Sequence, residues 1–61
     1  MKVREIIKLI ERDGWYRIKA KGGHRQFKHS LKKGRVTVSG QMNDELDKKT
    51  EKSILRQADL D

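Results

Sequence analysis

The chain has 61 residues, of which 41% are charged and 33% hydrophobic, and its sixteen lysines and arginines outnumber nine aspartates and glutamates to give a net charge of +7. This length predicts one small domain, over residues 1–61, with a thin core. The absence of cysteine excludes disulfide frameworks and thiolate metal sites, and no apolar run is long enough to span a membrane, so we expect a cytoplasmic protein.

The first predicted element is an amphipathic helix from about Lys2 to Asp13. Its apolar residues recur at positions i, i+3, i+4 and i+7, and they are Val3, Ile6, Ile7 and Ile10. Gly14 follows directly, at the position where a left-handed residue commonly ends a helix. We therefore expect this helix to cover the core with one face.

The aromatic and β-branched segment Trp15–Ala20 predicts the first strand. Trp15 and Ile18 would lie on opposite faces of a regular strand, a conflict that a bulge or a strand starting at Tyr16 would remove. Trp15 has two interpretations, a core residue or a base-stacking surface. We favour the core, because so small a domain needs large apolar side chains there.

A glycine pair and a histidine come before the second predicted strand. The alternation in His24–His29 places Phe27 toward the core and His24 toward solvent. Gly22 and Gly23 allow a tight reversal of the chain or a close approach of phosphate to the backbone. Histidine is the side chain that ordinarily gains and loses protons near neutral pH, so His24 is a candidate catalyst. A hairpin turn followed by a surface histidine is the alternative.

Arg35–Val38 predicts the third strand, and Asp47–Ala58 predicts a second helix with Asp47 as its N-cap. The inward positions of this helix are Thr50, Ile54, Leu55 and Ala58. The order of elements predicts an α+β fold, α-β-β-β-α, with a three-stranded antiparallel sheet and both helices on one face. The third strand, if it lies at the sheet edge, could pair with a copy of itself in a weak homodimer.

Basic residues concentrate between Arg17 and Arg35, where no acid interrupts them. The predicted phosphate-binding residues are Lys19, Lys21, Gly22, Gly23, Arg25 and Lys28. His29 lies on the strand face opposite to His24, so we expect it to be structural. The two histidines then cannot share a metal ion, and we expect no metal and no cofactor.

Three segments carry a resemblance to a known family: Lys21–Phe27, Gly34–Val38 and Ser53–Ala58 with Leu60. They are similar to the Gly-Ser-His motif, the Val-Thr-Val strand and the Ile-Leu-x-Gln-Ala-Gly-Leu ending of the HicA toxins, small endoribonucleases of bacterial toxin–antitoxin pairs that cleave mRNA. The resemblance covers nearly the whole chain. It implies a fold like that of double-stranded-RNA-binding domains, His24 as the catalytic histidine and cleavage without a metal. It also implies a HicB antitoxin that covers the active site and could pair with the third strand.

Four positions depart from the family pattern. Gly23 stands where serine is usual, Ser39 where proline commonly follows the strand, Gln41 where a histidine is often found, and Asp59 where glycine usually caps the last helix. Gly23 lacks a hydroxyl that could bind phosphate or the imidazole, and Gln41 matters if a second proton-transfer group normally sits there, so a toxin of impaired activity is one alternative. We expect Ser39 and Asp59 to affect stability more than chemistry.

The resulting hypothesis is an endoribonuclease in which His24 acts as general base on the ribose 2'-hydroxyl or as general acid on the 5'-oxygen, while basic residues bind the RNA phosphates. One rival is a non-catalytic module that binds double-stranded RNA by shape and charge. The other is a protein-interaction domain with an acidic partner. The sequence pattern favours no particular RNA sequence for cleavage.

Overall fold

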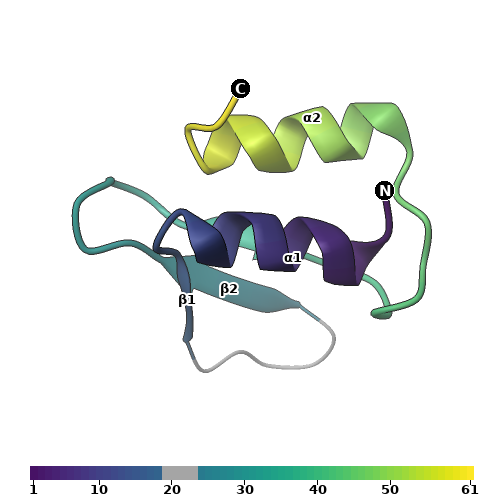
Figure 1. The fold of residues 1–61 in the computed structure, drawn as a ribbon, viewed down its shortest axis with the longest axis horizontal. Helices are drawn as coiled ribbons and strands as arrows, with labels where there is room; N and C mark the ends of the chain where they lie inside the picture. Colours follow the sequence, from purple (N-terminus) through teal and green to yellow (C-terminus); the bar gives the residue numbers. More distant parts are fainter. Residues whose placement is uncertain (19–23) are drawn as a thin grey trace.

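The computed structural model describes residues 1–18 and 24–61 and has two helices and three strands in these ranges (Figure 1). They are α1 (Val3–Arg12), β1 (Tyr16–Ile18), β2 (Arg25–Lys28), β3 (Val36–Val38) and α2 (Lys48–Gln57). The strands form one antiparallel sheet in the order β1-β2-β3, and both helices lie on the same side of it. The predicted α+β fold is confirmed. No helix within the described ranges is long and apolar enough to cross a membrane.

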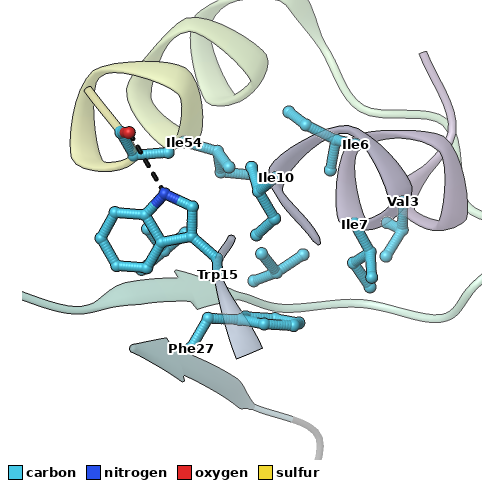
Figure 2. Close-up of a cluster of buried hydrophobic side chains, with 10 residues drawn as sticks. Val3, Ile6, Ile7, Ile10, Trp15, Phe27 and Ile54 are labelled. Carbon is cyan, nitrogen blue, oxygen red and sulfur yellow. Dashed lines mark hydrogen bonds between the residues drawn. The ribbon is translucent and has the colours of Figure 1, made fainter. Parts of the chain in front are cut away.

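The core lies between the sheet and the two helices (Figure 2). Its buried side chains are Val3, Ile6, Ile7, Ile10, Trp15, Phe27, Val36, Val38, Ile54 and Ala58. The four predicted core residues of α1 are therefore confirmed, whereas Leu9, which widens the apolar stripe in the sequence, is 37% exposed. In α2 the pattern is right at Ile54 and Ala58 but wrong at Thr50, which is exposed. Thr50 lies in the first turn, where its backbone N–H donates to the N-cap carboxylate of Asp47 at 2.9 Å.

Trp15 joins the ends of both helices to the sheet. Its side chain is 2% exposed, and its indole N–H donates to the carbonyl of Ala58, just after α2, at 3.2 Å (Figure 2). Strand β1 begins one residue later, at Tyr16, and its Ile18 pairs with Gln26 on the sheet face away from the core, so Trp15 alone of the two is a core residue. The prediction that Trp15 belongs to the core is confirmed.

A cluster of polar contacts surrounds Trp15. The Lys32 ammonium, from the turn between β2 and β3, donates to Asp13 Oδ2 at 2.5 Å and to the carbonyls of Ala58 and Asp59 at 3.1 Å each. This hydrogen bond and the charge of Lys32 hold the pKa of Asp13 below its usual range. Gly14 ends α1 with φ +105°, as predicted, and a Cβ there would lie only 2.8 Å from His29 Nε2. The β2–β3 turn is thus fixed to the ends of both helices.

We expect Trp15→Phe to lower the free energy of unfolding by about 2 kcal/mol, because it shrinks the largest core side chain and removes one of the two hydrogen bonds to the Ala58 carbonyl, leaving only that from Lys32. Urea denaturation followed by circular dichroism measures this. Tyr16→Phe is the matched control, since Tyr16 is exposed and the same experiment should show a change within about 0.5 kcal/mol. Equal effects of the two substitutions would contradict the role of Trp15.

The lowered pKa of Asp13 predicts a loss of stability in acid. A carboxyl whose pKa is lower in the folded than in the unfolded chain stabilises the fold above its unfolded value, near 3.8, and this stabilisation disappears as the pH falls through the folded value. Asp13→Asn should therefore lower the melting temperature at pH 7 but make it less dependent on pH in the acid range. Thermal melts from neutral to strongly acidic pH test this, with the exposed Asp61→Asn as control. A parallel acid loss in Asp13→Asn and wild type would count against it.

Candidate functional site

The sheet face away from the helices carries the candidate site. Because Phe27, Val36 and Val38 point into the core, the residues that alternate with them point to the open face. In the described part of the chain, these open-face positions of the strands and their adjoining residues are Tyr16, Ile18, His24, Gln26, Lys28, Arg35, Thr37 and Ser39. None of these residues is a carboxylate, and two of them, Lys28 and Arg35, are cations. This face of the sheet is therefore polar and basic.

His24 lies at one end of this face. Its side chain is exposed, as predicted, and its Nδ1 is 2.9 Å from the hydroxyl oxygen of Ser39. Within the described residues its other ring nitrogen, Nε2, has no hydrogen-bond partner. An exposed imidazole held at one nitrogen can exchange a proton with a bound molecule through the other.

The contact with Ser39 follows from the register of β2 and β3. Arg25 pairs with Val38 and Gln26 with Thr37, so the next pair outward in the same register is His24 and Ser39. The two side chains leave neighbouring strands on the same face and meet there. Ser39, which we expected to affect stability more than chemistry, therefore contacts the candidate catalyst.

Arg25 lies on the other face of β2, with Phe27, and is half-buried. Its guanidinium donates to the carbonyl of Gly40 at 2.6 Å. Arg25 was predicted to bind phosphate, and the structure shows that one of its donors holds the chain just after β3. Its remaining N–H groups are the ones that an RNA phosphate would have to use.

The other residues predicted to bind phosphate divide into two groups. Lys28 is exposed on the open face, where it pairs across the strands with Tyr16. It is four residues from His24, about 13 Å along the strand, so the two side chains would reach different phosphates of one RNA strand. The predicted residues Lys19, Lys21, Gly22 and Gly23 lie outside the described residues.

Sequence reasoning missed two residues of this face as members of the site. Arg35 Nη1 donates to Gln26 Oε1 at 3.1 Å, which places a further cation on the open face. Ser39 is the other. The alternation of side chains around Val36 and Val38 could have placed both Arg35 and Ser39 on the open face. Their partners on the β2 side depend on the strand register, which the length of the β2–β3 turn sets.

His29 lies at the opposite end of β2 and is structural in its contacts, as predicted. Its Nε2–H donates to the Asp13 carbonyl at 2.6 Å, and its Nδ1 accepts the backbone N–H groups of Leu31 and Lys32 at 3.0 and 3.2 Å. Two backbone donors at Nδ1 require the proton to be on Nε2. Its ring also packs edge-on against Trp15, with centroids 5.2 Å apart.

The described ranges contain no group of three or more histidine, cysteine, aspartate or glutamate side chains that could hold a metal ion. The chemistry that the described residues of this face offer is proton transfer by His24 and binding of anions by Lys28 and Arg35.

Strand β3 forms one edge of the sheet, as expected for a strand that could pair with another chain. Its outward N–H, that of Thr37, donates to the side chain of Gln57 on α2 at 3.1 Å. A second copy or a partner strand would have to displace Gln57 to pair here.

A model of one protein family matches residues 3–60, from the first residue of α1 to beyond the end of α2. The family is described as the HicA toxin of bacterial toxin–antitoxin systems. Among curated proteins, no match to the chain is found.

The two histidines of β2 give a matched pair of predictions about stability. His29→Ala should lower the free energy of unfolding by about 1–3 kcal/mol, because it leaves backbone donors and an acceptor without their partner. His24→Ala should change it by no more than about 0.5 kcal/mol, because His24 is exposed. Chemical denaturation of both variants measures these two changes. If His24→Ala lost more stability than His29→Ala, the structural role of His29 would be contradicted.

Proposed function

The chain belongs to the family of HicA toxins of bacterial toxin–antitoxin systems, and on this premise we propose that it is an endoribonuclease that cleaves mRNA with His24 as its proton-transfer group. The observation that supports this most directly is an exposed histidine at the end of a basic sheet face whose described strand positions carry no carboxylate. The cations of this face attract a polyanionic substrate, and the exposed imidazole is accessible to it.

The reaction needs no nucleophile from the protein, because RNA carries its own. The ribose 2'-oxygen attacks the adjacent phosphorus, a bond forms between them, and the bond from phosphorus to the 5'-oxygen breaks. The 2'-hydroxyl loses its proton and the 5'-oxygen gains one. His24 either accepts the first proton while water supplies the second, or supplies the second while water accepts the first. The products are an RNA with a 2',3'-cyclic phosphate and an RNA with a 5'-hydroxyl.

Cations must offset the charge that develops on the phosphate during this reaction. In this proposal the groups that bind the RNA are the predicted ones, Lys19, Lys21, Gly22, Gly23, Arg25 and Lys28. Lys28 is exposed on the same face as His24, which supports its part in binding. Metal ions take no part, since His24 and the cations can supply the proton transfer and the positive charge.

The toxin family implies a HicB-type antitoxin as the partner. We propose that this antitoxin inhibits the toxin by covering the end of the sheet that carries His24. Pairing of β3 with the antitoxin, or with a second copy of the toxin, is a further part of the proposal, and it requires Gln57 to release Thr37.

The test is cleavage of a long unstructured RNA in the presence of a chelator, by wild type and by His24→Ala. We expect wild type to give fragments ending in cyclic phosphate, and His24→Ala to be slower by about 10²–10⁴-fold, the usual range for a lost general acid or base. Circular dichroism confirms that both are folded. Cleavage by both at equal rates would overturn the role of His24.

The rival function, RNA binding without cleavage, gives a different result in the same samples. It predicts no RNA fragments at any protein concentration. It also predicts RNA binding that weakens steeply as the salt concentration rises, because the protein's lysines and arginines displace counterions from the RNA phosphates. Lys28→Glu should weaken that binding under either function. Absence of RNA binding near physiological salt would instead favour an acidic protein partner.

A further inference from the structure

Ser39 is the one side chain in the described part of the chain that forms a hydrogen bond with the imidazole of His24, and the distance from its hydroxyl oxygen to Nδ1 is 2.9 Å. Both side chains are exposed, so the contact is not imposed by core packing. It follows instead from the pairing of β2 with β3, which places the two residues opposite each other on the open face.

The position of Ser39 is fixed from both sides along the chain. Val38, just before it, is fully buried and pairs with Arg25. Gly40, just after it, has φ +96° and gives its carbonyl to the Arg25 guanidinium at 2.6 Å. The first residue of β2, Arg25, thus holds the chain on both sides of Ser39, while His24, just before β2, meets its hydroxyl.

The loop that continues from Ser39 is anchored as well. Asp44 Oδ2 accepts the backbone N–H of Gln41 at 2.9 Å, which closes the turn. The first N–H groups of α1, those of Val3 and Arg4, donate to the carbonyls of Asp44 and Met42 at 3.0 and 3.1 Å. The loop therefore satisfies the free donors at the start of a helix and is held to the core through it.

A hydroxyl suits a histidine that changes its protonation during a reaction. When Nδ1 carries a proton it donates to the serine oxygen, and when Nδ1 is unprotonated the serine hydroxyl donates to it. The contact therefore exists with the histidine in either neutral tautomer and in the charged form. In all of them Nδ1 has the hydroxyl as its partner, and Nε2 has no hydrogen-bond partner among the described residues.

We propose that Ser39 is a positioning residue for His24, whose hydroxyl holds Nδ1 and so makes Nε2 the nitrogen that exchanges a proton with the RNA. The proposal rests on the proposed ribonuclease activity and assigns to Ser39 a part in it. In chemical terms, the exposed His24 imidazole, which could otherwise rotate freely, is held in one orientation before the substrate binds.

The experiment compares wild type with Ser39→Ala, which removes the hydroxyl, and Ser39→Thr, which keeps it. Ser30→Ala, which removes an exposed hydroxyl from the β2–β3 turn, is the matched control. Two readouts are taken on each protein: kcat and KM for cleavage of one RNA, and the ¹⁵N chemical shifts of the ring nitrogens. His29, whose ring is held by three backbone contacts, is the internal reference for the shifts.

We expect Ser39→Ala to lower kcat about fivefold, the factor that corresponds to one net hydrogen bond, with little change in KM. The ¹⁵N shifts of His24 should move toward those of a free histidine while those of His29 stay unchanged. Ser39→Thr should restore both readouts, and Ser30→Ala should resemble wild type.

Unchanged His24 shifts and an unchanged kcat in Ser39→Ala, with an active wild type, would overturn the positioning role and leave the proposed ribonuclease standing. A wild type that cleaves no RNA would overturn the ribonuclease and the catalytic part of this proposal together. In that case a shift of His24 in Ser39→Ala would still establish the contact itself, so the two failures are distinguishable.

Discussion

The indole of Trp15 is the contact on which the rest of this structure depends. The core has few large side chains, and Trp15 is the one that reaches both helices: it directly follows the end of α1, and its N–H donates to the carbonyl at the end of α2. The turn between β2 and β3 meets the same place through His29 and Lys32. In a chain of this size, burial alone contributes little stability, so directed hydrogen bonds around one aromatic ring define how the layers meet.

This arrangement divides strand β2 into two ends with different tasks. At its carboxyl end, His29 is nearly buried and has backbone partners at both ring nitrogens. At its amino end, His24 is exposed and has a hydroxyl partner at one. A histidine is structural here where both of its ring nitrogens have hydrogen-bond partners, and it is available for proton transfer where one ring nitrogen has no partner among the described residues. Because His24 itself is exposed and Trp15 lies at the other end of the strand, we expect substitution of the His24 side chain to change the core little.

Much of this could be predicted from the sequence, because the patterns were local. The apolar spacing of α1, the alternation around Phe27, the turn at Gly14 and the cap at Asp47 each depend on residues within a few positions of one another. Asp59 has φ +56°, the left-handed conformation expected where glycine is usual in the family. The prediction that Thr50 faces the core was wrong. Thr50 lies in the first turn of α2, where its backbone N–H donates to the N-cap residue Asp47 and its side chain need not be buried.

The contacts of the candidate site were beyond the sequence for a physical reason. His24 with Ser39, and Arg25 with Gly40, join residues fifteen positions apart, and their meeting depends on the register of two strands. A shift of one residue in that register would have sent each side chain to the other face. Residue types alone identified the histidine and the cations, whereas the orienting hydroxyl and the anchoring role of Arg25 required the pairing to be known.

The absence of carboxylates from the described open face also bears on how the toxin is controlled. Under the proposed function, RNA is attracted to this face by the same cations that any acidic partner surface would meet there. An antitoxin that covered His24 would bind in competition with the substrate and would need no change in the toxin's fold. The anchored loop at Ser39 supports this view, because it gives substrate and antitoxin a surface that is already formed before either arrives. Under the proposed function, inhibition would then require only that the antitoxin occupy this charged, preformed surface.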